Sequence, residues 1–166
     1  TQTNMNLNEV LARRASQLLS VSSQKREAIH PNDHCNLGQS SNDTYPTAMH
    51  IAALIKLRDD FIPAASSLHK TMRTKALEFS DVVKIGRTHS MDATPMTLGQ
   101  EFDTFAEQIS KNLERVNAAS RFLLEVPQGG TAVGTGLNTP EGWDQKIVSE
   151  IAKLSGLELS PAKSKF

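Results

Sequence analysis

The sequence predicts an all-α fold, a bundle of long helices, and two patterns carry that prediction. Apolar residues recur at steps of three and four from Leu98 to Leu123, the periodicity of a helix in a bundle or coiled-coil seam. A second run, from Ala48 to Leu57, is apolar nearly all round, which is typical of a helix buried on most of its sides. Asp81–Ile85 is the only strand-like run of note, so little sheet is expected.

The elements before residue 80 follow in order. Asn6 or Asn8 can cap a first helix, which should fade near Ser20. From about residue 22 to 43 the chain has no period and many turn-forming residues, so a loop is expected there. Thr44 and Pro46 suit the start of the long apolar helix, and Pro63 should kink or divide that helix.

The elements after residue 80 include the longest helix. Thr97 and Gln100 match a capping box, and the helix they open should run to about Glu125. At ~1.5 Å per residue it would be about 42 Å long, so partners in other subunits are expected. A glycine-rich turn from 128 to 138 precedes a last helix, which starts near Thr139 and ends at Gly156.

Composition excludes several classes of function. The 166 residues carry 18 basic and 18 acidic side chains, so no net field favours nucleic acid or an anionic membrane surface. No apolar run reaches the ~18 residues of a membrane span. The single cysteine, Cys35, fits a reducing compartment, and no His, Cys and carboxylate set has the spacing of a metal site. Because the chain lacks an initiating Met and stops abruptly, it is interpreted as a piece of a longer protein.

Three polar segments are candidate sites, each with an ordinary structural alternative. Ser40–Asp43 places neutral donors before a helix N-terminus, where free N–H groups suit a carboxylate, yet the same residues are common N-caps. His30–Asp33 could contact an anion or form an ordinary turn. His89, in a loop with Thr88 and Asp92, can change its charge near neutral pH, although most loop histidines have no catalytic role.

Five separated motifs, in the right order, resemble class II fumarase (fumarate hydratase) of the aspartase/fumarase superfamily. They are Thr1-Gln-Thr-Asn-Met-Asn6, His30-Pro-Asn-Asp33, Gln39-Ser-Ser-Asn-Asp43, Gly86-Arg-Thr-His89 with Asp92-Ala-Thr-Pro95, and Gln128-Gly-Gly-Thr-Ala-Val-Gly-Thr-Gly-Leu-Asn138. The resemblance implies reversible addition of water to fumarate to give L-malate, with no metal or organic cofactor. It also implies the cytoplasm, or the mitochondrial matrix in a eukaryote.

The resemblance further implies a role for individual residues. His89 matches the histidine that works with a bound water in proton transfer. The positions that match contacts to the substrate carboxylates are Thr1, Ser40, Ser41, Asn42 and Thr88. The positions that match a second, non-catalytic dicarboxylate site are His30, Pro31, Asn32 and Asp33.

The family's assembly sets further expectations. By resemblance, residues 1–39 end an N-terminal domain, and residues 40–166 begin the central helical domain of a homotetramer whose active site draws on three subunits. The family's mobile loop with the general-base serine does not occur in this sequence, so the isolated 166 residues are expected to be inactive. Met91 also departs from the family, which usually has Gln there.

Two alternatives accompany this interpretation. Aspartate ammonia-lyases of the same superfamily typically carry Gln where His89 stands, and Thr where Ser41 stands, so both positions favour fumarase. A non-enzymatic helical assembly module would be supported by the Leu98–Leu123 stripe alone. Such a module would self-associate without binding dicarboxylates.

Overall fold

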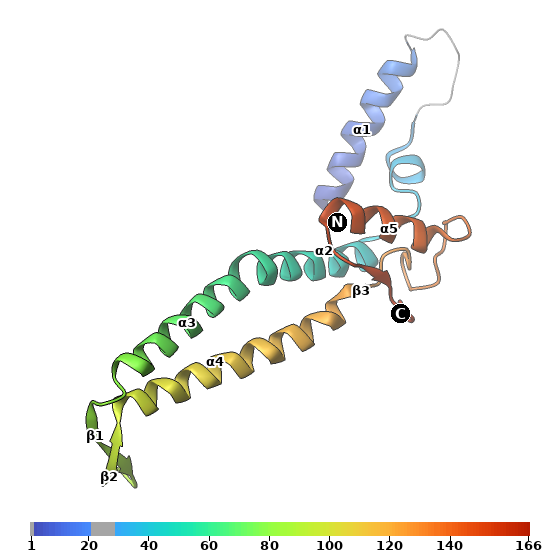
Figure 1. Ribbon diagram of the computed structural model, residues 1–166. Helices are drawn as coiled ribbons and strands as arrows, with labels where there is room; N and C mark the ends of the chain where they lie inside the picture. Colours follow the sequence, from blue (N-terminus) through green and yellow to red (C-terminus); the bar gives the residue numbers. More distant parts are fainter. Residues whose placement is uncertain (1, 21–28) are drawn as a thin grey trace. The chain divides into compact units, whose positions relative to one another are not determined.

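The structure is a computed structural model that describes residues 2–20 and 29–166. It confirms the all-α, long-helix fold class, with only short strands beside the helices (Figure 1). Two compact units are formed, one by residues 1–51 and 124–166 and the other by residues 52–123. The predicted boundary between residues 39 and 40 concerns the domains of a longer enzyme and stays a prediction.

The longer elements and their bounds are α1 Gln2–Ser20, α2 Ser41–Lys56, α3 Ile62–Glu78, β1 Val83–Thr88, β2 Met91–Thr97, α4 Leu98–Ser120 and α5 Trp143–Ser155. The shorter ones are the π-helical turns η1 Pro31–Cys35 and η2 Leu57–Phe61, the 3-10 turn η3 Arg121–Leu124, and the strands β3 Glu125–Val126 and β4 Ser160–Pro161.

Helix α1 begins at Gln2, ahead of both predicted caps, and ends at Ser20 as expected. The prediction of a cap at Asn6 or Asn8 is wrong, because Asn8 makes a tertiary contact instead. Its side chain is buried and donates to Asn36 Oδ1 at 3.1 Å, and Asn4 donates to the same oxygen at 3.0 Å. These amides tie α1 to the segment that follows η1.

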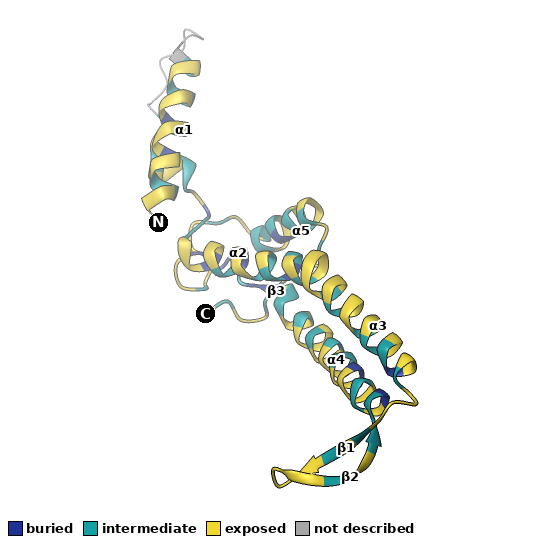
Figure 2. Ribbon diagram, turned by 90° about the vertical axis from the view of Figure 1, so that its left-hand side faces the viewer, coloured by how far each residue is buried: buried dark blue, intermediate teal, exposed yellow. Residues whose placement is uncertain are grey.

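Helix α2 begins at Ser41, three residues before the expected start at Thr44. The interruption expected at Pro63 takes the form of the π-helical turn η2, after which Pro63 occupies the first turn of α3. The helical path continues from η2 into α3, because Phe61 and Ile62 both have helical φ and ψ. The expected burial of α2 on most sides is not found within the described chain: Leu54 is buried, but Met49 is 58% exposed (Figure 2).

In the second unit α3 and α4 lie side by side, with β1 and β2 at their far end (Figure 1). Phe79 and Phe102 pack edge to face between the helices, with ring centroids 5.4 Å apart. The predicted capping box is confirmed: Gln100 N donates to Thr97 Oγ1 at 3.2 Å, and Thr97 N donates to Gln100 Oε1 at 3.0 Å. Helix α4 ends at Ser120 and the chain tightens into η3 before the predicted end at Glu125.

The loop expected around His89 is shorter than predicted, because residues 83–97 form an antiparallel hairpin and only a two-residue turn remains. Strand β1 includes the strand-like run predicted up to Ile85 and continues to Thr88. Thr88 pairs with Met91, so His89 and Ser90 are the two residues of the turn. Both have positive φ, of 51° and 60°, as a type I′ hairpin turn requires.

In the first unit Val126 of β3 and Val148 of α5 are the fully buried hydrophobic residues. Helix α5 starts at Trp143, after the predicted Thr139, because Gly142 has a φ of 71° that interrupts a helical path. It ends at Gly156 as predicted. Among the described helices none is both long and apolar enough to span a bilayer.

Candidate active site

The first candidate segment lies at the N-terminus of α2, and the capping interpretation holds for part of it. Ser40 Oγ accepts the N–H of Asn42 at 3.2 Å, as an N-cap hydroxyl does. The side chains of Ser41 and Asn42 are exposed. Asn42 Nδ2 donates to the carbonyl of Ala132 at 2.7 Å, which fixes the orientation of its amide. The segment therefore presents neutral hydroxyl and amide groups at the N-terminus of a helix.

Asp43 has a role that local sequence patterns do not reveal. Its side chain is 2% exposed, and its Oδ2 accepts the N–H groups of Gly129 at 3.0 Å and Thr131 at 2.9 Å. Its Oδ1 accepts the N–H of Ser40 at 3.1 Å. A buried carboxylate is tolerated when neutral donors satisfy it in this way. Asp43 thus joins the start of α2 to the glycine-rich turn.

A cavity of about 470 Å³ brings residues of both dicarboxylate predictions together. Ser40 and Ser41, from the proposed substrate site, line it together with Asn32 and Asp33 from the proposed second site. Thr131, from the glycine-rich turn, also contributes to its wall. Of the described lining residues only Asp33 carries a charge, so the cavity presents mainly neutral groups.

His30 shapes the turn that carries Asn32 and Asp33. Its Nδ1 accepts the N–H of Asn32 at 3.3 Å and of Asp33 at 3.2 Å, so His30 caps η1. The backbone N–H of His30 in turn donates to Nδ1 of His34 at 2.9 Å. The same Nδ1 lies 3.3 Å from Asp33 Oδ2, so His30 and Asp33 are neighbours within this turn. Pro31 begins η1.

Thr88 and His89 stand at the end of the β1–β2 hairpin, and both are exposed. The carboxylate of Asp92, in β2, lies 4.0 Å from the guanidinium of Arg87. His89 is the first residue of the two-residue turn. This hairpin and the start of α2 belong to different compact units. Thr1 falls outside the described residues.

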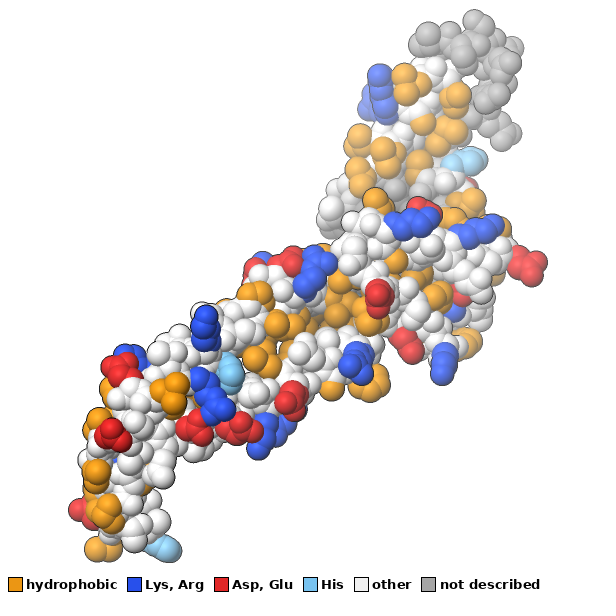
Figure 3. Space-filling model, in the orientation of Figure 1, with side chains coloured by type: hydrophobic (Ala, Val, Ile, Leu, Met, Phe, Trp, Pro, Cys, Tyr) orange, Lys and Arg blue, Asp and Glu red, His pale blue; other side chains and the backbone are white. Residues whose placement is uncertain are grey.

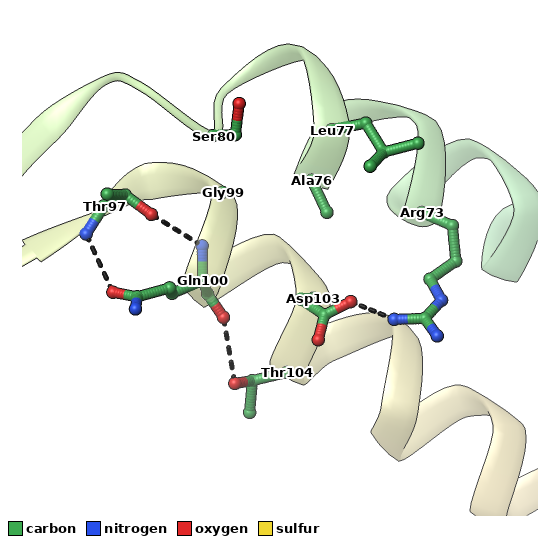
Figure 4. Close-up of a pocket in the computed structure, with 9 residues that line it drawn as sticks. All are labelled: Arg73, Ala76, Leu77, Ser80, Thr97, Gly99, Gln100, Asp103 and Thr104. Atoms are coloured by element: carbon green, nitrogen blue, oxygen red, sulfur yellow. Dashed lines mark hydrogen bonds and ion pairs between the residues drawn. The ribbon is translucent and has the colours of Figure 1, made fainter.

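A cavity of about 830 Å³ between α3 and α4 contains none of the predicted site residues (Figure 4). Its charged groups, Arg73 and Asp103, form an ion pair. Thr97 and Gln100 are engaged in the capping box, and Thr104 Oγ1 donates to the Gln100 carbonyl at 3.0 Å. Because these polar groups already serve helix structure, we assign no chemistry to this cavity.

No group of three or more His, Cys, Asp or Glu side chains in the described part of the chain has an arrangement that could hold a metal ion. The polar side chains exposed at the start of α2 are the hydroxyl of Ser41 and the amide of Asn42. These groups can bind a carboxylate by hydrogen bonds alone.

A family model described as "Lyase" matches residues 1–166, and the chain belongs to that lyase family. It is 54% identical over 166 residues to the class II fumarate hydratase of Nitrosomonas europaea, of which it covers 36%. It is 48% identical to the mitochondrial fumarate hydratase of Schizosaccharomyces pombe, of which it covers 32%. Both alignments include 100% of this chain.

The fold is also similar to that of a solved structure. The crystal structure of recombinant class II fumarase from Schistosoma mansoni matches with a TM-score of 0.85 and 39% sequence identity. The match covers 100% of this chain and 38% of that one. The chain therefore spans about a third of the length of the relatives it matches.

Proposed function

We propose that the protein containing this chain catalyses the reversible hydration of fumarate to L-malate. The observation that carries the proposal is the cluster of neutral donors at the start of α2, with Ser40 and Ser41 lining the cavity and Asn42 held by the Ala132 carbonyl. Removing the malate proton beside a carboxylate creates an enediolate-like dianion, which preorganised donors stabilise. Sequence identity to fumarate hydratases over the whole chain supports the same reaction.

In this mechanism the residues divide into three groups. His89, exposed at the hairpin turn, moves the proton together with a water, which an imidazole does well near neutral pH. The substrate carboxylates are held by Thr1, Ser40, Ser41, Asn42 and Thr88. The second dicarboxylate site is formed by His30, Pro31, Asn32 and Asp33. The reaction uses no cofactor.

We further propose that the active protein is a homotetramer joined through its long helices. Exposed apolar side chains support this assembly, because a large hydrophobic residue in water favours burial against a partner. On α1 Leu7 is 57% and Val10 is 66% exposed, and hydrophobic side chains lie at the surface of that helix in Figure 3. The bacterial and mitochondrial relatives support a location in the cytoplasm or the mitochondrial matrix.

The exposed apolar surface of α4, where Phe105 is 43% exposed, also favours the second candidate, a helical assembly module without catalytic activity. Calorimetric titration with malate separates the two, because only the hydratase binds the dicarboxylate. Ammonia release from aspartate tests the remaining alternative, an aspartate ammonia-lyase. Ser41 and His89 both argue against that activity.

The activity can be tested by replacing the matching segment of the Nitrosomonas europaea enzyme with these 166 residues. The chimera should consume fumarate, followed by the loss of its ultraviolet absorbance, whereas the 166 residues alone should not. His89→Asn should lower kcat by about 10²–10⁴-fold, the usual contribution of general acid–base catalysis, with a much smaller change in KM. His69→Asn, in helix α3, is the matched control and should leave kcat unchanged. A folded chimera that does not turn over fumarate would refute the proposal.

A further inference from the structure

The buried carboxylate of Asp43 lies next to a proposed substrate contact without being one itself. We propose that Asp43 is a positioning residue for the hydration reaction, and that it orients the side-chain amide of Asn42 by holding the backbone of the glycine-rich turn. This inference rests on the proposed function. It assigns the reaction a residue that touches neither the substrate nor the reacting atoms.

The first step of the argument is the attachment of the turn to Asp43. One oxygen, Oδ2, accepts two backbone N–H groups of the turn, from Gly129 at 3.0 Å and from Thr131 at 2.9 Å. The side-chain amide of Gln128 approaches the same oxygen at 3.5 Å. Hydrogen bonds to an ionised acceptor are stronger than bonds between neutral groups. Burial at 2% exposure keeps water from competing for the carboxylate.

The second step is the unusual conformation of Thr131. Its φ is 59°, in the left-handed region that a β-branched side chain rarely adopts. Its buried hydroxyl has no hydrogen-bond partner among the described residues, so no bond of that hydroxyl offsets the strain. Such conformations persist only where the surroundings impose them. The bond from Thr131 N–H to Asp43 Oδ2 is the side-chain contact at this residue that can hold the conformation.

The third step leads from the turn to the proposed substrate contact. The residue after Thr131 is Ala132, and its carbonyl oxygen accepts a hydrogen bond from Asn42 Nδ2 at 2.7 Å. This bond uses one amide hydrogen of Asn42 and so determines which way Oδ1 and the other hydrogen face. A shift of the turn would release the amide to rotate. Asp43 therefore acts on Asn42 through two consecutive residues of the turn.

A double-mutant cycle in the chimera tests this pathway. Asp43→Asn leaves one side-chain oxygen where two now accept the N–H groups of Ser40, Gly129 and Thr131, and it turns an NH2 donor toward some of them. The turn should therefore loosen, and kcat should fall about tenfold or more while KM changes less. In an Asn42→Ala background the same substitution should change kcat less than twofold, because the group that it positions is gone. Asp60→Asn, an exposed aspartate in η2, is the control and should leave kcat unchanged. Equal losses in both backgrounds would overturn the inference.

A rescue experiment separates positioning from a general structural role. Thr131→Gly lets the turn adopt positive φ without the help of Asp43. Added to Asp43→Asn, it should recover a measurable part of the lost kcat; no recovery would count against the pathway. If Asp43→Asn fails to fold, Gly129→Ala takes its place in the cycle with Asn42→Ala. At a φ of 91°, its added Cβ would lie 2.6 Å from Asp144 Cα and displace the same turn.

Amide hydrogen exchange keeps this inference separate from the proposed function. If the unsubstituted chimera does not hydrate fumarate, the proposed function fails. The proposed positioning role of Asp43 is then tested by the rate of amide hydrogen exchange at Gly129 and Thr131. Asp43→Asn should speed exchange at both amides, with the rest of α2 unchanged. Unaltered protection at both positions would overturn the positioning role whatever the activity.

Discussion

Gly99→Ala is expected to destabilise the protein, because α3 and α4 make backbone contact at Gly99. An added Cβ would lie 2.4 Å from the carbonyl oxygen of Ala76, 2.9 Å from that of Phe79 and 2.9 Å from Ser80 Cα. These are backbone atoms, so no change of side-chain rotamer relieves the contact. To reach the 3.4 Å at which ordinary contact begins, the backbones must separate by 3.4 − 2.4, or about 1 Å.

The expected cost follows from that overlap. Overpacking of this kind costs about 1–3 kcal/mol, and the hydrogen bond from Gly99 N to Phe79 O, now 2.9 Å, is weakened as well. The better helix propensity of Ala returns at most about 1 kcal/mol. A net loss of about 2 kcal/mol is therefore expected in the free energy of unfolding. With a urea m-value of about 2 kcal/mol/M, the midpoint should fall by about 1 M.

Urea denaturation followed by circular dichroism measures this change. Gly142→Ala is a suitable comparison, because its Cβ would meet no atom within 4 Å and only its φ of 71° is unfavourable. The free energy of unfolding of Gly142→Ala should fall by less, about 1 kcal/mol. Because Leu98 N also donates to Val82 O at 2.8 Å, the same crossing anchors the hairpin that carries His89. An unchanged or higher urea midpoint for Gly99→Ala would show that α3 and α4 can separate at Gly99 without loss of stability, and it would refute this prediction.

Three further changes address single interactions. Trp143→Phe removes the indole bond to the Gly38 carbonyl, now 3.1 Å, and should lower the unfolding free energy by about 1 kcal/mol in urea titrations; no loss would mean that water replaces the bond. Thr97→Ala removes the side-chain half of the capping box and should cost about 1 kcal/mol in the same assay, with Thr97→Ser close to the original. Lys165 Nζ lies 2.9 Å from Asp144 Oδ2, and its hydrogen bond lowers the pKa of that carboxyl in the folded protein. The pair therefore stabilises the fold at any pH above the pKa that Asp144 has in the unfolded chain. This stabilisation is lost as the pH falls through the lower pKa of the folded state. Lys165→Met should therefore cost up to about 1 kcal/mol at neutral pH and less in acid, and a cost independent of pH in thermal melts would contradict this.

Features that depend on neighbouring residues were predictable from the sequence. The capping box at Thr97 and the stop at Gly156 both involve contacts within one helical turn. The hairpin turn at His89-Ser90 was not predictable, because it lacks the Asn-Gly or Asp-Gly signal that usually marks positive φ at both positions. Asn8 was similarly misassigned, because Asn36, its partner, lies 28 positions away.

The helical class, the resemblance to the lyase family and the residue types of the candidate site could all be predicted from the sequence. Helical periodicity and motif order are properties of the chain that need no coordinates. The contacts of Asp43 became visible only in the folded chain, since its partners Gly129 and Thr131 lie 86 and 88 positions away. The fold also places Ser40 and Asn32 in the wall of one cavity, which the sequence does not show. A buried carboxylate takes its function from the donors that folding brings to it, and no local pattern specifies them.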